Sequence, residues 1–174
     1  MTPARHYTYV GPESIRSACE GEPPGHAISD IEQLHAWLDE LCRLDPSAEG
    51  WATYVVGIDG QLRVAHRRTE HVACAGGGDV LGAGEVQFDD TGEVLWISNY
   101  SSGYCPDVSC YEEVRSAFER ANLPLPSSFS HAVVFRKCPA CGARNVIKDE
   151  DFHCAICTAP VPREWNFAKQ TGTR

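Results

Sequence analysis

The chain has 174 residues, of which 43% are hydrophobic, and this is enough for one main core with a small appendage. Its formal net charge of -9 argues against a nucleic-acid partner, because binding to phosphates depends on clustered Lys and Arg. No stretch reaches the about 20 apolar residues of a membrane span, and the N-terminal residues lack the apolar core of a signal peptide, so we expect a cytoplasmic protein without a membrane partner.

The first predicted element is a short strand at His6–Val10 (HYTYV), where aromatic and β-branched residues predominate. Residues 11–25 are rich in Gly and Pro and predict irregular structure that could hold a turn of helix. Ser29 and Glu32 then have the spacing of a capping box, and apolar residues recur behind them at helical spacing. We therefore expect a helix from about residue 30 to residue 44.

Two hairpins follow in the sequence. Residues 51–58 (WATYVVGI) and 61–67 (QLRVAHR) predict strands joined by Asp59-Gly60, which accepts the positive φ angles of a tight primed turn. Residues 85–89 (EVQFD) and 93–98 (EVLWIS) repeat this arrangement. The segment between the hairpins is rich in glycine and small residues, so we expect a close approach of two backbones there.

A second capping box, Ser109 to Glu112, predicts another helix, which ends near Asn122. Residues 131–136 (HAVVFR) predict a final strand that leads into a cysteine motif. Strands mixed with two helices that do not alternate regularly predict an α+β fold with a mostly antiparallel sheet and a C-terminal four-cysteine zinc ribbon. The expected boundaries are 1–135 for the α+β domain, 136–160 for the ribbon and 161–174 for a tail.

Nine cysteines, an odd number without a secretion signal, favour metal ligation and free thiols over disulfides. Four of them form two C-x-x-C pairs with twelve residues between the pairs, which is the spacing of a two-knuckle zinc site. Four thiolates leave no open position on the ion, so we expect one structural zinc. Iron in a rubredoxin-like electron-transfer site is the chemical alternative. The predicted metal ligands are Cys138, Cys141, Cys154 and Cys157.

The ribbon itself is predicted to contain two short strands, residues 145–148 and 151–154, around a charged turn. A segment of about twenty residues cannot bury its own core, so the metal is expected to hold the fold. The exposed face of the ribbon could recognise a partner protein. Four basic residues are expected to cluster around the thiolates and offset their charge: Arg136, Lys137, Arg144 and Lys148.

Two central segments place polar side chains beside glycine, as binding loops often do. The glycine run lacks the Lys-Ser/Thr of a phosphate loop and so is not a nucleotide cradle. The expected binding-loop residues are Gly76, Gly77, Gly78, Ser101, Ser102 and Tyr104.

These segments resemble those of a family of uncharacterised bacterial proteins. The shared features are an EHVACAGG-type segment, a GE-x-x-F strand, an SN-x-S-x-GYCP loop, a C-terminal zinc ribbon and a Trp-Asn-Phe tail, which together span nearly the whole chain. A weaker similarity links Ser101, Tyr104 and Pro106 to the S-G-H-Y-x-P loop of toxin-associated domains, with Gly103 in place of the histidine. The resemblance to the first family implies a shape and no activity. The glycine-rich loops and the ribbon face favour a zinc-binding accessory or protein-interaction module that holds a partner protein, and the weaker similarity suggests a bacterial conflict or toxin-related setting.

The alternative is a cysteine-dependent enzyme with a pocket between the Gly76–Gly78 and Ser101–Pro106 loops. Cys105 would be the nucleophile, because it precedes a helix whose N-terminus lowers the pKa of a thiol, and Cys110 lies in the first turn of that helix. The candidate catalytic residues are Cys105, His71, His131 and Glu85.

Each of these residues also has a structural interpretation. Small cysteines are commonly buried in cores. His71 would begin a strand as a hydrogen-bonded sheet histidine, and Tyr104 would be a packed aromatic with a paired hydroxyl. At the C-terminus, Trp165 and Phe167 are expected to dock onto their own domain, with a peptide for a partner protein as the alternative, and residues 169–174 are expected to be disordered.

Overall fold

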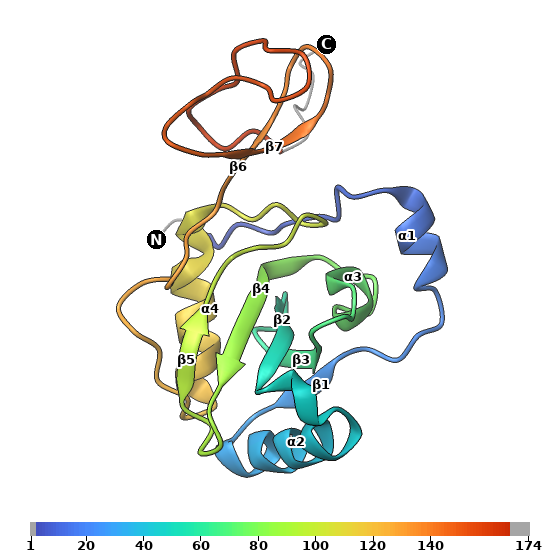
Figure 1. Cartoon of the computed structure of the whole chain (residues 1–174), viewed down its shortest axis with the longest axis vertical. Coiled ribbons are helices and arrows are strands. Elements are labelled where there is room, and N and C mark those ends of the chain that lie inside the picture. The colour runs from blue at the N-terminus through green and yellow to red at the C-terminus, as the bar shows by residue number, and fades with distance from the viewer. Residues whose placement is uncertain (1–2, 168–174) are drawn as a thin grey trace. The chain divides into compact units, whose positions relative to one another are not determined.

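The computed structural model describes residues 3–167. These residues form two compact units, which divide between Ala132 and Val133 (Figure 1). The first unit is built on a five-stranded antiparallel sheet, and the second holds a two-stranded sheet and the cysteine motif. The predicted α+β class is therefore confirmed. None of the helices within residues 3–167 has the length and apolar character needed to cross a membrane.

The first unit combines short helices with the sheet. Its helices are α1 (Glu13–Ala18), α2 (Ile31–Leu44), α3 (His71–Cys74) and α4 (Tyr111–Arg120), with short 3-10 helices η1 (Pro46–Ala48) and η2 (Val108–Cys110). Its strands are β1 (His26–Ile28), β2 (Trp51–Gly57), β3 (Leu62–His66), β4 (Val80–Phe88) and β5 (Val94–Ile97). The strands lie in the order β1-β3-β2-β4-β5, so β1 and β5 are the edges.

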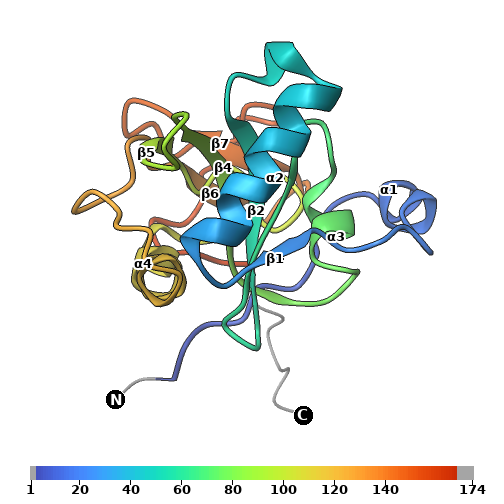
Figure 2. The same ribbon diagram turned by 90° about the horizontal axis from the view of Figure 1, so that it is seen from below.

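The core lies where α4 packs on the central strands. Tyr54 of β2 is opposite Val64 of β3 and Gly84 of β4, and its ring meets Phe118 of α4 edge to face at 5.7 Å between centroids. The apolar stripe of α4 faces inward, as its helical spacing predicts. Its buried members are Val114, Ala117 and Phe118, and Ala121, the residue that follows the helix, is buried as well. Figure 2 views the same unit from the end at which α2 lies.

The helix predicted from residue 30 is confirmed as α2, but the predicted cap is off by one residue. The Asp30 carboxylate accepts a hydrogen bond of 2.8 Å from the Gln33 amide, and the Gln33 side chain accepts one of 2.7 Å from the Ser29 amide. Both Ser29–Glu32 and Asp30–Gln33 have capping-box spacing, so the sequence pattern admits either register.

Both predicted hairpins are confirmed, with two differences. In the first hairpin only Gly60 takes a positive φ, of 77°, while Asp59 does not, so the turn ends in a single left-handed glycine and is not a primed turn. In the second hairpin, β4 already begins at Val80, so part of the glycine-rich segment is strand.

The expected close approach of two backbones occurs at Gly84. A Cβ atom on Gly84 would lie 1.9 Å from the carbonyl oxygen of Ser98. The same oxygen accepts a hydrogen bond of 2.8 Å from the Tyr54 hydroxyl. Glycine at this position thus lets the backbone after β5 lie directly against β4.

Two strands predicted in the first unit do not form, the strand at His6–Val10 and the strand that was to begin at His71. His6–Val10 is not a strand, because only Tyr7 pairs, through two backbone hydrogen bonds of 2.8 and 3.0 Å with Val80. Residues 11–25 include the helix α1, the turn of helix that the sequence left open. His71 begins the helix α3 and not a strand.

The second predicted capping box, Ser109 to Glu112, does not form. The Ser109 hydroxyl donates to the Asp107 carboxylate at 2.5 Å, and α4 begins at Tyr111 without a side-chain cap. The predicted end of the helix is confirmed, since Asn122 has a φ of 56° and the Leu123 amide bonds the Phe118 carbonyl at 2.9 Å.

The second unit contains the antiparallel strands β6 (Val134–Lys137) and β7 (Arg144–Ile147). The strand predicted at residues 151–154 does not form, and its only pairing is an isolated bridge between His153 and Pro160. The partner of β7 is the strand that precedes the first cysteine pair. Residues 161–167 belong to this unit, where Val161 is buried against two of the cysteines.

Candidate metal centre

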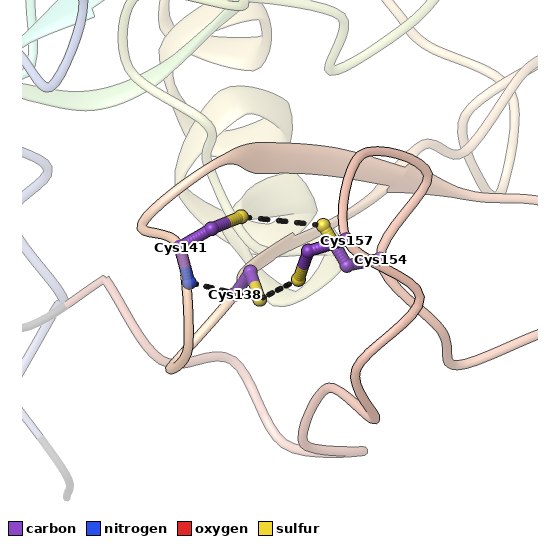
Figure 3. A group of neighbouring side chains, drawn as sticks. All are labelled: Cys138, Cys141, Cys154 and Cys157. Atoms are coloured by element: carbon purple, nitrogen blue, oxygen red, sulfur yellow. Dashed lines mark hydrogen bonds between the residues drawn. The ribbon is translucent and has the colours of Figure 1, made fainter.

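The four predicted ligands come together at the ends of two loops. Cys138 and Cys141 lie on the turn between β6 and β7, and Cys154 and Cys157 lie on the loop that follows β7 (Figure 3). Their sulfur atoms all lie within 4.8 Å of one another and point toward a common centre. Two hairpin-like turns thus bring together residues that are up to nineteen positions apart.

The sulfur separations fit a tetrahedral ion. The Sγ atoms of Cys138 and Cys157 are 3.6 Å apart, as are those of Cys141 and Cys154. Metal–sulfur bonds of about 2.3 Å in a regular tetrahedron place the sulfurs about 3.8 Å apart. A disulfide would require about 2.0 Å, and all four cysteines are free thiols. The arrangement suits one metal ion and not two disulfides.

Hydrogen-bond donors lower the pKa of two of the four thiols and so favour their thiolate forms. The Cys154 sulfur accepts from the Ile156 amide at 3.4 Å and from the Asn145 side chain at 3.5 Å. Together with the Cys157 amide, whose hydrogen bond has the largest effect, these donors lower the pKa of Cys154 to about 6. The Cys141 amide likewise lowers the pKa of Cys138.

Cys141 behaves differently from these two. The Ala143 amide lowers its pKa, but partial desolvation and the neighbouring thiols raise it to about 12. Four thiolates this close repel one another unless a cation lies between them. The donor set therefore fits a divalent ion that would be held by all four sulfurs.

Asn145 was not predicted as part of the centre. Its side-chain NH2 bonds the Cys154 sulfur, and its Oδ1 accepts from the Ala155 amide at 2.9 Å. It is buried on β7 and so links the strand to the second cysteine loop. The sequence shows only an Asn in the predicted strand that follows the first C-x-x-C pair. An Asn in such a position is too common to indicate a contact with a cysteine sulfur.

The predicted basic cluster around the thiolates is wrong for Arg136. Its guanidinium is buried and donates to the carbonyl oxygens of Phe135, Pro162 and Arg163. Its charged group also lies 5.9 Å from the centre of the Phe152 ring. The hydrogen bonds of Arg136 therefore hold the C-terminal segment against β6.

The C-terminal segment contacts β6 through Asn166. The Asn166 side chain accepts from the Lys137 amide at 2.8 Å and donates to the Lys137 carbonyl at 2.7 Å, which imitates a strand pairing. The rings of Trp165 and Phe167 lie on either side of Asn166 in the sequence and are 5.7 Å apart. The disorder predicted for residues 169–174 lies outside the described residues.

The two central loops meet each other, but through a buried side chain. The Tyr104 hydroxyl donates to the Gly78 carbonyl at 2.6 Å, and the Tyr104 ring is fully buried. Ser101 is also fully buried, and its hydroxyl accepts from the Tyr104 amide at 3.3 Å. Of the expected binding-loop residues, the exposed ones are Gly76, Gly77, Gly78 and Ser102.

Buried polar groups of the loop at 98–106 are hydrogen-bonded within the loop. The buried Asn99 side chain donates to the Pro106 carbonyl at 3.1 Å, and the Ser98 hydroxyl accepts from the Tyr100 amide at 3.2 Å. Buried polar groups of this kind stabilise a loop conformation. The polar residues beside glycine thus have an internal role here.

The cysteines of the enzyme hypothesis are buried. Cys105 is fully buried with a φ of 45°, and its thiol donates to the Ser102 carbonyl at 3.4 Å. Cys110 is buried as well, and this burial raises the pKa of its thiol. The predicted lowering of the Cys110 pKa by the helix N-terminus is therefore wrong.

The candidate bases have other partners. The Nε2 atom of His71 lies 2.9 Å from the Gly84 carbonyl, and burial lowers the pKa of His71 to about 4. His131 is exposed and stacks on Trp96 at 6.3 Å between ring centroids. Glu85 is half-buried on the sheet beside Gly84. The Cys105 thiol and the His71 ring thus each contact a backbone carbonyl oxygen.

Comparisons of the chain with models of known protein families, with curated proteins and with solved structures gave no match. What the chain does must therefore be inferred from its own residues. Those residues establish a four-cysteine cluster with the geometry of a closed metal site.

Proposed function

We propose that this protein is a zinc-stabilised protein-interaction module, in which one structural zinc ion holds the C-terminal unit. The observation that carries this proposal is the close approach of the four cysteine sulfurs, all within 4.8 Å of one another. Zinc suits four thiolates, and structural zinc sites are closed tetrahedra of this kind. Zinc is preferred over iron because it requires no redox partner.

A structural and not a catalytic role follows from the number of ligands. Catalytic zinc sites keep one position for water or substrate, whereas four cysteines fill the tetrahedron. The buried cluster around the site consists of Cys138, Cys154 and Val161, so two of its three members are candidate ligands. The metal would thus replace the large apolar core that this unit lacks.

The interaction surface in this proposal is the outer face of the ribbon. Ile156 lies between the second pair of cysteines and is 76% exposed, and Val146 of β7 is 41% exposed. A metal-bound turn holds such side chains in one conformation, which reduces the entropy lost when a partner binds. The similarity of Ser101, Tyr104 and Pro106 to toxin-associated domains supports a setting in a bacterial conflict system.

Metal content tests the first half of the proposal. Elemental analysis of the purified protein should find one zinc per chain, and Cys154→Ser should lose it. Cys42→Ser is the matched control, because Cys42 is an exposed cysteine outside the cluster. Iron in place of zinc, or equal metal content in both variants, would contradict a structural zinc site.

Crosslinking tests the second half. A photo-crosslinking amino acid at Ile156, expressed in the native cells, should trap one defined protein identified by mass spectrometry. The same group at Ile58, which is 59% exposed on the β2–β3 turn, is the control. The same protein trapped from both positions, or still trapped after Cys154→Ser, would show that the ribbon is not the interaction surface.

A further inference from the structure

The first unit has a groove that neither the metal centre nor the central loops use. It has a volume of about 680 Å³ and lies between α2, the η1 segment and the adjoining ends of β4 and β5. In Figure 1, α2 and the β4–β5 turn lie at the same end of the sheet. Its apolar lining comes from Leu38 and Leu41 of α2, Phe88 of β4 and Leu95 of β5. Leu95 is 57% exposed, so an apolar side chain is available at the groove.

The charged part of the lining is acidic. Among residues 3–167, no Lys or Arg lines the groove, and its five carboxylates are Asp39, Asp45, Glu49, Asp89 and Asp90. Two of them have internal partners, since Asp45 lies 2.7 Å from His66 and Asp89 accepts from the Thr91 and Glu93 amides.

The other three carboxylates are exposed and lack an ion-pair partner among residues 3–167. They are Asp39, Glu49 and Asp90. Because they come from α2, from the loop before β2 and from the β4–β5 turn, they surround the apolar lining from separate elements.

The charge of the whole unit has the same sign. Residues 1–132 contain twenty Asp and Glu, eight Arg and no Lys, which gives a formal charge of -12. Such a field attracts cationic partners and repels anionic ones, nucleic acid included. An occupant of this groove must therefore bring positive charge as well as an apolar group.

We propose that this groove is a docking site for a basic peptide segment of a partner protein, with one or more apolar anchor side chains. The anchors would contact Leu38, Leu41 and Leu95, and Lys or Arg beside them would pair with Asp39, Glu49 and Asp90. The volume lies within the range of sites that enclose a few side chains. This inference goes beyond the proposed zinc module, because the surface belongs to the other unit and does not require the metal.

Cys42 provides a direct probe, because it lines the groove and its side chain is exposed. The test peptide is acetyl-KLRKLLRK-amide, and acetyl-KSRKSSRK-amide is its counterpart of equal charge without anchors. Binding is measured by fluorescence anisotropy, and alkylation of Cys42 is followed by peptide mass spectrometry. The leucine peptide should bind and slow the alkylation of Cys42, and the serine peptide should do neither.

Paired variants separate the groove from general electrostatics. Asp39→Asn with Asp90→Asn should weaken binding of the leucine peptide by roughly five- to tenfold, as expected for two partly exposed ion pairs. Glu20→Gln with Glu22→Gln removes the same charge at the end of α1 and should leave affinity nearly unchanged. Leu95→Ser should weaken binding, whereas Ile58→Ser, an equally exposed site on another turn, should not.

Three results would contradict a docking site for a basic peptide. Equal losses in the two charge pairs, or unprotected Cys42 in the bound protein, would overturn the proposal. So would a groove that is already protected in the protein alone, with self-association in light scattering, since the occupant would then be a second copy. Cys154→Ser should retain the affinity for the peptide, so failure of this inference is distinguishable from failure of the zinc module.

Discussion

Replacing one metal ligand should unfold the second unit while the first stays folded. Cys154→Ser is the most informative change, because the Cys154 sulfur lies at the centre of the unit. It is 3.6 Å from the Cys141 sulfur, and it accepts hydrogen bonds from the Ile156 amide and the Asn145 side chain. The first unit contributes no ligand to this site.

The expected magnitude follows from what remains in the core. Zinc binding contributes about 10–16 kcal/mol in comparable sites. Without it, the cluster around the site keeps one buried residue that is not a ligand, Val161, at 6% exposure, and full burial of such a side chain contributes about 1.5–3 kcal/mol. The other buried apolar residues of this unit, Val133 and Phe135, lie outside this cluster. Ordering the backbone costs about 1–2 kcal/mol for every residue of the unit. The folded form of the second unit should therefore lose most of its population.

Amide hydrogen exchange with mass spectrometry measures this locally. Peptides from β6 and β7 should lose protection by about 100-fold or more, and peptides from β2 and β4 should keep theirs. Cys42→Ser should match the wild-type protein in both units. Retained protection of β6 and β7 in Cys154→Ser would refute the reasoning that the metal holds this unit together.

Three further predictions concern the first unit. Gly84→Ala should lower the free energy of unfolding by roughly 3 kcal/mol, because its Cβ would lie 1.9 Å from the Ser98 carbonyl oxygen. The control is Gly78→Ala, whose Cβ would lie 3.7 Å from its nearest neighbour and which should be nearly neutral. Urea titrations measure both. Similar losses in both would show that the backbone approach is not the cause. His71 is kept neutral by burial, so stability should fall as the pH drops from about 6.5, its unfolded pKa, to its folded pKa of about 4, by up to about 3 kcal/mol, and His71→Gln should remove this part of the pH dependence. An unchanged pH profile in that variant would count against it. Tyr104→Phe should cost about 1 kcal/mol by removing its hydrogen bond to the Gly78 carbonyl, and a neutral thermal shift would contradict that role.

The burial of the loop residues in the first unit could not be predicted from residue type. The pattern at 97–106 combines Ser, Asn, Tyr and Gly, which are the residues of both exposed binding loops and buried polar networks. Here Ser101, Tyr104 and Cys105 are buried. Burial depends on which segments cover the loop, and those come from distant parts of the chain. Residue type alone could not distinguish the two cases.

The groove and the helix caps depended on geometry in a similar way. Leu95 and Asp39 are 56 positions apart and line one groove only because β5 and α2 meet at the same end of the sheet. In the cap of α2, two overlapping patterns competed, and the hydrogen bonds of Asp30 decided between them.

The α+β class, the two hairpins, the helices α2 and α4 and the four cysteines of the candidate metal centre were predictable from the sequence. These features depend on spacing over a few residues, such as the two cysteines of each C-x-x-C turn, and local spacing is written directly in the chain. The burial of Cys105 and Cys110, the hydrogen bonds of Arg136 to the C-terminal segment and the acidic groove beside α2 are visible only in the folded chain. Solvent exposure and pairing between distant segments are properties of the packed chain, because they depend on which surfaces meet.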